Sequence, residues 1–279
     1  MNILFPVTVE EALDSLQANP DAKVMAGGTD LLVKRRAGSP APGCIVCLEK
    51  VADIMGVGIL EDRIRIGAAT TMTALLKNEA VREELPLLHS AMKFFASPLV
   101  RNMATLGGNI CTASPAADSL PPLYVLGAEV EIYSSAGKRH MSIADFITAP
   151  GRTALVPGEL LGAVTVPVPL KNCIQHFEKV GRRKALAISV VSLAALLRIE
   201  EGVIAEARLA WGSVGPTVVR CPEAEALLMG REPTMETFIR VGESVRRAVR
   251  PISDIRASVE YRRQVAANLV LRLAGQGTD

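Results

Sequence analysis

A stretch of small and polar residues from Ser97 to Pro122 constrains this chain more than any other feature. It is rich in Gly, Ala, Ser, Thr and Pro and has few charges, so it cannot form one regular helix or strand. Within it, the residues from Ala104 to Asp118 are expected to form a long loop, and a long loop inside a compact domain is usually either functional or disordered. The apolar residues Leu106, Ile110 and Ala113 argue against disorder, and we therefore expect a loop that binds a ligand.

Two loops carry glycine pairs. The first loop contains Gly27-Gly28, and the second loop, within this stretch, contains Gly107-Gly108. Paired glycines let a ligand approach the backbone, and successive N–H groups can converge on an anion. Backbone amides suit a diphosphate because they stabilise its charge without a lysine. The first loop is neither a dinucleotide fingerprint nor a P-loop, and on its own it could be an ordinary turn. Together the two loops predict two walls of one pyrophosphate site.

Hydrophobic periodicity predicts an α+β fold. Thr8 and Glu11 form a capping-box pattern at the start of the first helix. The predicted helices cover 9–18, 72–83, 86–96, 222–229, 234–249 and 258–273. The predicted strands cover 23–26, 44–48, 63–66, 160–168, 174–180, 187–199 and 203–211, and a hairpin covers 129–140. Pro167 and Pro169 mark a boundary between a first part, 1–170, and a second part, 171–279, in which a three-stranded antiparallel sheet is backed by helices.

Composition excludes several classes of protein. The 279 residues are 49% hydrophobic and 22% charged, as in an ordinary globular protein, and the net charge of +2 is too small to indicate nucleic acid or an anionic membrane as a partner. Aromatic residues make up only 4%, which weakens base stacking as a function. No apolar run is long enough for a membrane span. Five cysteines without an export signal predict reduced thiols and a cytoplasmic location.

The cysteines and histidines suggest no metal site. Cys44 and Cys47 stand in a strand, where residues three apart point to opposite faces, so two buried thiols are favoured over a redox or metal pair. Cys111 is expected to be a small packing residue. The three histidines are scattered, and none stands in a metal motif.

Two groups of basic residues need an explanation. The arginines near the C-terminus, which alternate with acidic residues, predict a solvated helix face or a subunit contact rather than a nucleic-acid site. They are Arg246, Arg247, Arg250, Arg256, Arg262, Arg263 and Arg272. The cluster Arg182-Arg183-Lys184 is either a charged loop or a site that attracts an anionic cofactor or electron acceptor.

Five segments resemble the FAD subunit of the molybdenum hydroxylases, the family of xanthine dehydrogenases and carbon monoxide dehydrogenase medium subunits. The segments are AGGTDLL at 26–32, FASPLVRNMATLGGNICTASPAADSLPP at 95–122, FEKVGRRKALAISVVSLAALL at 177–197, GSVGPTVVRCPEAEALL at 212–228 and SDIRASVEYRRQVAANLVLRL at 253–273. The resemblance covers nearly the whole chain, and the second glycine loop is its most specific part.

The resemblance implies a fold, a cofactor and partners. It implies a vanillyl-alcohol-oxidase (PCMH)-type FAD-binding domain of two subdomains over 1–170 and a C-terminal flavoprotein domain of the carbon monoxide dehydrogenase type over 171–279. FAD would be bound non-covalently. A large subunit would carry molybdopterin and a small subunit two [2Fe–2S] clusters, in a dimer of heterotrimers. Electrons would pass through FAD to an acceptor such as NAD. No catalytic acid, base or nucleophile is expected in this chain.

The resemblance also implies which residues contact FAD. Those expected to line the pyrophosphate and ribitol are Met25, Ala26, Gly27, Gly28, Thr29, Asp30 and Leu31. Those expected on the opposite wall are Thr105, Gly107, Gly108 and Asn109, with Cys111 packed near the flavin. Asp118 matches an acidic residue near the adenosine ribose, and Phe95 and Ala96 match positions beside the flavin ring. Leu161 matches a position that lines the adenine or flavin pocket, and Lys179 matches a lysine near the site.

Ala185 and Leu186 depart from the family's NAD-reducing animal members, which carry two acidic residues there, so their acceptor preference does not transfer. The chain also lacks the segment that carries a further iron–sulfur cluster in some members. Two other functions stay open: a stand-alone flavin oxidase or dehydrogenase, which would need a base of its own, and an assembly scaffold without cofactor.

Overall fold

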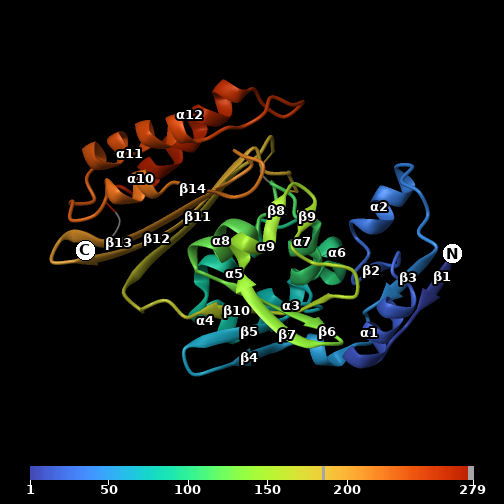
Figure 1. The fold of residues 1–279 in the computed structure, drawn as a ribbon. Coiled ribbons are helices and arrows are strands. Elements are labelled where there is room, and N and C mark those ends of the chain that lie inside the picture. Colours follow the sequence, from blue (N-terminus) through green and yellow to red (C-terminus); the bar gives the residue numbers. More distant parts are fainter. Residues whose placement is uncertain (184–185, 276–279) are drawn as a thin grey trace. The chain divides into compact units, whose positions relative to one another are not determined.

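The computed structural model describes residues 1–183 and 186–275, which form two compact units. The first unit comprises Met1–Arg82, Ser97–Ala113 and Gly127–Pro167, and the second comprises Glu83–Ala96, Ser114–Leu126 and the chain from Val168 on. The predicted α+β class is confirmed (Figure 1). Two segments that precede residue 170 in sequence therefore pack with the second unit, and the predicted domain boundary at that residue stays a prediction.

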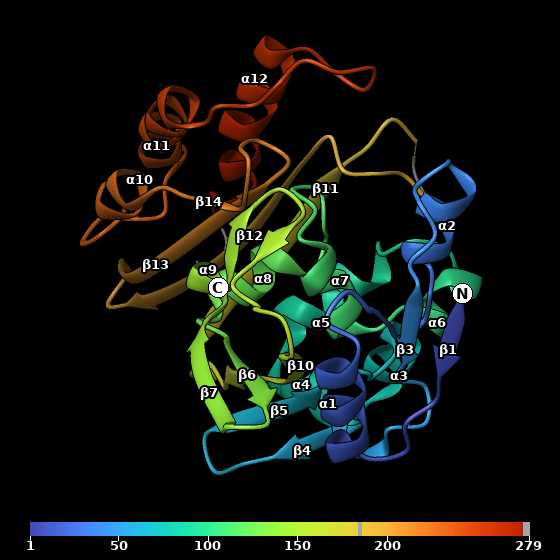
Figure 2. The same ribbon diagram turned by 45° about the vertical axis from the view of Figure 1, so that its right-hand side comes forward.

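The described part of the first unit contains two larger sheets (Figure 2) and a two-stranded sheet of β8 (Ile147–Ala149) and β9 (Arg152–Thr153). The smaller sheet is parallel, in the order β1 (Asn2–Leu4), β3 (Cys44–Cys47) and β2 (Lys23–Met25). Helix α1 (Val9–Ala18) begins at Thr8, whose side chain accepts a hydrogen bond from the Glu11 N–H, as the capping-box pattern predicts. Its apolar face, Ala12, Leu13 and Leu16, is buried in a core that both sheets share.

The larger sheet of the first unit is antiparallel. Its order is β4 (Val57–Ile59), β5 (Arg63–Gly67), β10 (Leu160–Pro167), β6 (Glu129–Ser134) and β7 (Gly137–Ser142). On β5, Ile64 and Ile66 are fully buried, while Arg65 between them pairs with Glu131 on β6. This alternation is the period-two pattern of a strand with one apolar face. The remaining elements of the unit are η1 (Ala52–Ile54), α2 (Leu31–Arg36), α3 (Met72–Lys77), α6 (Pro98–Met103), α7 (Leu106–Thr112), α9 (Ile143–Phe146), β8 (Ile147–Ala149) and β9 (Arg152–Thr153), and α4 (Glu79–Glu84) runs from it into the second unit.

The second unit is built on an antiparallel sheet in the order β11 (Cys173–Val180), β12 (Val191–Glu200), β13 (Val203–Gly212) and β14 (Val219–Arg220). The three predicted strands are confirmed, although the second begins at Val191 rather than at Ala187, and β14 adds a short fourth strand at the edge. Helices α10 (Pro222–Ala226), α11 (Met235–Ala248), α12 (Val259–Leu269) and η2 (Val270–Leu273) cover one face. Helices α5 (Pro86–Lys93) and α8 (Leu120–Val125) pack against the other (Figure 1).

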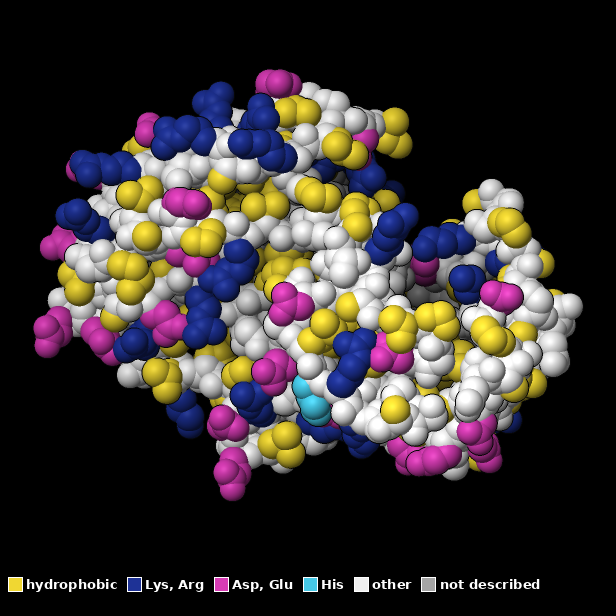
Figure 3. Space-filling model, in the orientation of Figure 1, with side chains coloured by type: hydrophobic (Ala, Val, Ile, Leu, Met, Phe, Trp, Pro, Cys, Tyr) yellow, Lys and Arg dark blue, Asp and Glu magenta, His cyan; other side chains and the backbone are white. Residues whose placement is uncertain are grey.

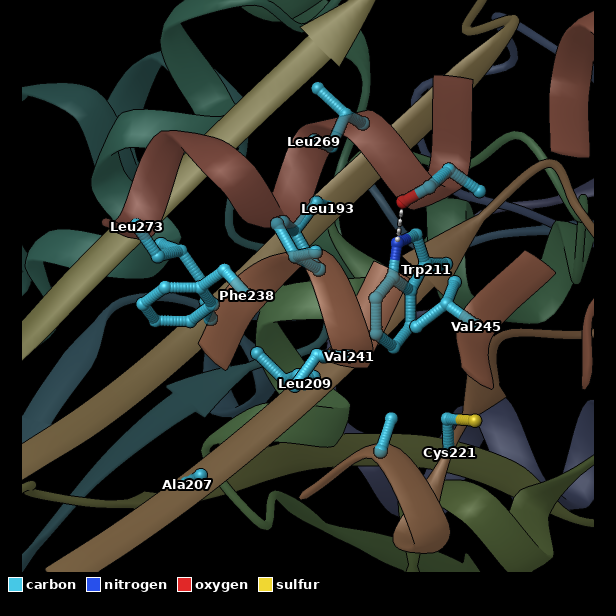
Figure 4. Packing of buried hydrophobic residues seen from close by; sticks show 14 of the residues in the cluster. Leu193, Ala207, Leu209, Trp211, Cys221, Phe238, Val241, Val245, Leu269 and Leu273 are labelled. Carbon is cyan, nitrogen blue, oxygen red and sulfur yellow. Dashed lines mark hydrogen bonds between the residues drawn. The ribbon is translucent and has the colours of Figure 1, made fainter. Parts of the chain in front are cut away.

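Trp211 on β13 lies at the centre of the core between this sheet and its helices (Figure 4). It is fully buried, and its indole Nε1 donates to the Ala266 carbonyl on α12 at 3.1 Å. A buried indole that keeps its hydrogen bond contributes its full apolar surface to the core. The Phe238, Val241 and Val245 side chains of α11 belong to the same buried cluster, with Val245 beside the indole and Phe238 beside Leu273.

The stretch from Ser97 to Pro122 is not one regular helix or strand, as predicted, because it contains α6, α7 and the start of α8. The long loop expected over 104–118 was wrong, since α7 occupies its first half. Two of the helices begin at a side-chain cap: the Ser97 hydroxyl accepts from the Val100 N–H at the start of α6, and the Thr105 hydroxyl accepts from the Gly108 N–H at the start of α7. Caps of this kind start short helices even where intrinsic helix propensity is poor.

Candidate functional site

The two glycine loops lie side by side in the first unit, as the sequence predicts. The backbone of Gly27 lies so close to the last turn of α6 that a Cβ atom at this position would be 1.6 Å from the Met103 carbonyl oxygen. Met103 immediately precedes the second loop, which continues through Thr105 into α7. Packing of the two loops therefore requires glycine at position 27, because any side chain would force the loops apart.

The first loop presents unused backbone donors. Among the residues that the structure describes, the N–H groups of Gly27, Gly28 and Thr29 have no protein acceptor. Gly28 has φ +69°, in the left-handed region that favours glycine. The side chain of Asp30 forms an ion pair with Lys34 at 2.6 Å. Unpaired adjacent amides of this kind form a concave site for an anion.

The second loop, by contrast, uses its amides within the protein. The N–H of Leu106 donates to the Thr70 carbonyl, that of Gly107 to the Ala68 carbonyl at 2.8 Å, and that of Gly108 to the Thr105 hydroxyl at 3.0 Å. This loop therefore offers a ligand a surface without bulky side chains rather than a set of free amides.

A third turn of small residues, Gly67-Ala68-Ala69-Thr70-Thr71, supports the second loop and was not predicted. A Cβ on Gly107 would lie 2.6 Å from the Ala68 Cβ, and the Ala68 N–H donates to the Gly162 carbonyl at 2.9 Å. The run of small residues directly after β5 was the signal that would have revealed it. Leu161, which precedes Gly162 on β10, is buried beside this turn.

Cys111 lies on α7, and burial raises the pKa of its thiol to about 12. It is therefore a neutral thiol at physiological pH. Cys44 and Cys47 are both buried, as expected of packing residues. The described part of the chain contains no group of three or more His, Cys, Asp or Glu residues that could hold a metal ion.

A buried ion pair marks the second unit. Lys179 on β11 and Asp118 before α8 approach to 2.6 Å between Nζ and Oδ2, and their side chains are only 6% and 7% exposed. Lys179 Nζ also donates to the Phe94 carbonyl at 3.1 Å. The other carboxylate oxygen, Asp118 Oδ1, is buried and has no hydrogen-bond partner in the described structure. An unsatisfied buried acceptor costs free energy and indicates a donor supplied by a bound molecule.

Burial raises the pKa of Asp118 to about 6, and the attraction of Lys179 opposes this rise only in part. The carboxyl therefore titrates close to physiological pH. Phe94, whose carbonyl Lys179 contacts, also packs its ring against Phe177, with centroids 6.1 Å apart. The positions that the family resemblance implies beside the flavin ring are its neighbours Phe95 and Ala96. Ala96 has a left-handed φ of +38°.

The Asp118 carboxyl gives a pH-dependent stability. Its pKa is higher in the folded chain, about 6, than in the unfolded chain, near the ordinary value of 3.8. Its contribution to stability is complete below pH 4 and is lost as the pH rises through 6, by about 3 kcal/mol in all. We expect the free energy of unfolding of the Asp118→Asn variant, relative to that of the wild type, to rise by about this amount between pH 4 and pH 7, as measured by urea unfolding. An unchanged difference across this range would contradict the raised pKa.

The remaining basic cluster is only partly described. Arg182 Nη1 donates to the Ile255 carbonyl at 2.9 Å, and Arg183 donates to the Leu186 carbonyl. Lys184 and Ala185 lie outside the described residues. The first belongs to the cluster expected to attract an anion, and the second to the expected departure from the NAD-reducing members.

The described helices are all too short or too polar to span a membrane.

The structure thus divides the predicted site residues between the two units. Those in the first unit are Met25, Ala26, Gly27, Gly28, Thr29, Asp30, Leu31, Thr105, Gly107, Gly108, Asn109, Cys111 and Leu161. Those in the second unit are Phe95, Ala96, Asp118 and Lys179. The first group offers amide donors for an anion, and the second offers a buried carboxylate acceptor for a hydroxyl or amide.

Comparison with known protein families gives two matches that together cover most of the chain. Residues 1–169 match the family model described as the FAD binding domain in molybdopterin dehydrogenase. Residues 175–276 match the model described as the CO dehydrogenase flavoprotein C-terminal domain.

Individual relatives agree with these matches. The chain is 38% identical to the xanthine dehydrogenase FAD-binding subunit of Escherichia coli O157:H7, over 91% of this chain and 88% of the relative. It is 30% identical to the nicotinate dehydrogenase FAD-subunit of Eubacterium barkeri, over 96% and 93%. Among solved structures, a chain of carbon monoxide dehydrogenase from Hydrogenophaga pseudoflava matches with a TM-score of 0.94 and 27% identity, over 98% of this chain and 95% of that one. Quinoline 2-oxidoreductase from Pseudomonas putida 86 matches with a TM-score of 0.94 and 29% identity, over 99% and 97%.

Proposed function

Because the chain belongs to the family of FAD-binding subunits of the xanthine and carbon monoxide dehydrogenase type, we propose that it carries electrons from the [2Fe–2S] clusters of a partner subunit through FAD to an external acceptor such as NAD. It is the flavoprotein component of an oxidoreductase, and its cofactor is FAD. Iron–sulfur clusters transfer single electrons and nicotinamide accepts a hydride, whereas FAD can exchange either one electron or two.

The single observation that carries the proposal is the set of free amides in the first loop. Gly27, Gly28 and Thr29 present N–H groups without protein acceptors, next to a second loop that lacks large side chains. Such a loop fits the diphosphate of FAD because each amide donates to a charged oxygen without requiring a cation. The family resemblance adds Asp118, whose buried Oδ1 lacks a hydrogen-bond partner in the described structure, as a contact to the adenosine ribose. We therefore propose both groups of residues as FAD contacts.

The protein's own residues bind and orient the cofactor in this proposal. Lys179 fixes the Asp118 carboxylate, and the neutral thiol of Cys111 packs without reacting. We propose no catalytic acid or base in this chain, and the substrate would be hydroxylated on a molybdopterin-containing large subunit. A [2Fe–2S] small subunit, a dimer of heterotrimers and a cytoplasmic location complete the proposal. The domains would be 1–170 for FAD and 171–279 for the C-terminal flavoprotein domain.

The purified chain, expressed with ample riboflavin, tests this function. We expect about one FAD per chain, with flavin released on denaturation because binding is non-covalent. Anaerobic NADH should then bleach the flavin absorbance if NAD is the acceptor. A colourless chain would contradict the flavin function. A yellow chain that NADH leaves unchanged would contradict only NAD as the acceptor, and turnover of a small substrate by this chain alone would favour a stand-alone oxidase.

A further inference from the structure

A basic cavity of about 650 Å³ lies on the outer side of the second unit, between α11 and α12. Four arginines and two glutamates line it: Arg246, Arg247, Arg250, Arg263, Glu243 and Glu260. Figure 3 shows Lys and Arg side chains gathered over this part of the molecule. Among the described residues, no aromatic or aliphatic side chain lines the cavity, so these residues offer neither a surface for base stacking nor a pocket for an apolar anchor.

The arginines of this cavity are not neutralised by their neighbours. Within the described residues, none of the four forms an ion pair with a carboxylate. Arg240, on helix α11, by contrast does form an ion pair, with Glu236 four residues earlier. Glu243 and Arg247 have the same spacing but do not pair. The guanidinium groups of the cavity are therefore available to an external anion.

Arg263 provides a second, independent observation. Its Nε atom is buried and has no hydrogen-bond partner in the described structure. Arg250 differs, since its Nη1 atom donates to the Arg247 and Val249 carbonyls at the end of α11. A buried guanidinium nitrogen without an acceptor is costly, and a bound carboxylate would satisfy it.

We propose that this cavity binds an acidic polypeptide segment of a partner protein. Arginine forks match carboxylates in bidentate geometry. An extended segment places the side chains of one face about 7 Å apart, so its carboxylates can meet the arginines while smaller residues pass Glu243 and Glu260. A compact polyphosphate would concentrate its charge beside both glutamates, which disfavours it. This surface lies outside the proposed FAD contacts, and the inference does not depend on flavin binding.

Fluorescence anisotropy with a fluorescein-labelled decaglutamate peptide tests the proposal on the full chain. We expect saturable binding that weakens with added salt. The double variant Arg246→Gln/Arg263→Gln should bind about tenfold or more weakly, because it loses two charge-assisted contacts but keeps much of the aliphatic stems. The matched control Arg231→Gln/Arg240→Gln removes the same charge from the second unit outside the cavity and should change binding by less than about twofold.

A second variant tests the proposal even if the first variant misfolds. Glu243→Gln/Glu260→Gln removes the local repulsion and should tighten binding of the peptide about threefold. Equal losses in the cavity and control variants, or no binding by the wild type, would overturn the proposal. Displacement of the peptide by tripolyphosphate at lower concentrations than by unlabelled decaglutamate would overturn it in favour of a phosphate ligand.

Discussion

The Gly27→Ala variant is expected to lose FAD almost completely. The new Cβ atom would lie 1.6 Å from the Met103 carbonyl oxygen, which belongs to the backbone and cannot rotate away. The loops must separate, which costs on the order of 2 kcal/mol as overpacking. The displaced amides then lose two or more charge-assisted hydrogen bonds, so FAD affinity should fall about 100-fold or more. Flavin content after gel filtration and titration of the apoprotein with FAD measure the effect.

Two further glycines provide graded controls. Gly43→Ala should keep wild-type FAD content and change stability by less than about 1 kcal/mol, because no atom of the described residues lies within 4 Å of its added Cβ. Gly28→Ala should have an intermediate effect, since its φ of +69° costs an alanine roughly 1–2 kcal/mol but its closest neighbour is the movable tip of Leu32. Wild-type flavin content in Gly27→Ala would show that the contact between the loops does not shape the FAD site.

The Lys179→Met variant should be strongly destabilised at pH 8. Lys179 is the cation that compensates Asp118, and both side chains are almost completely buried. Removing one member of such a pair leaves an isolated buried charge and costs about 3–5 kcal/mol. The loss should shrink towards pH 5. Without the lysine the pKa of Asp118 rises further, so protonation restores a neutral side chain as the pH falls. Urea unfolding at pH 5 and pH 8 measures both effects.

The matched control for this variant is Lys171→Met. Lys171 is exposed in the segment before β11, and its replacement should change stability by less than about 0.5 kcal/mol at either pH. The double variant Lys179→Met/Asp118→Asn should recover much of the stability at pH 8, because no charge is then buried. A loss that stays constant between pH 5 and pH 8 would indicate that lost packing, rather than an uncompensated carboxylate, causes the destabilisation.

Local patterns predicted one helix with its bounds and three strands with approximate bounds. Helix α1 has the predicted bounds because a cap at Thr8, an apolar face and the stop at Asn19-Pro20 all act within one short segment. The strands β11, β12 and β13 alternate or run apolar over eight to ten residues, which is a strong signal. The short elements β1, α2 and β4 were missed, because three to six residues carry too little periodicity to be recognised.

Local patterns in the chain were enough to predict the chemistry of the loops: small residues, paired glycines and the family pattern that indicates FAD. The tertiary structure alone decided that Gly27 lies on the Met103 carbonyl, that Ala68 supports Gly107, and that Lys179 meets Asp118 across 61 positions. It also decided which amides remain free, since those of the second loop are used by neighbouring turns. Local sequence fixes backbone preference, but partners distant in the chain are set by packing of the whole core, which no short pattern encodes.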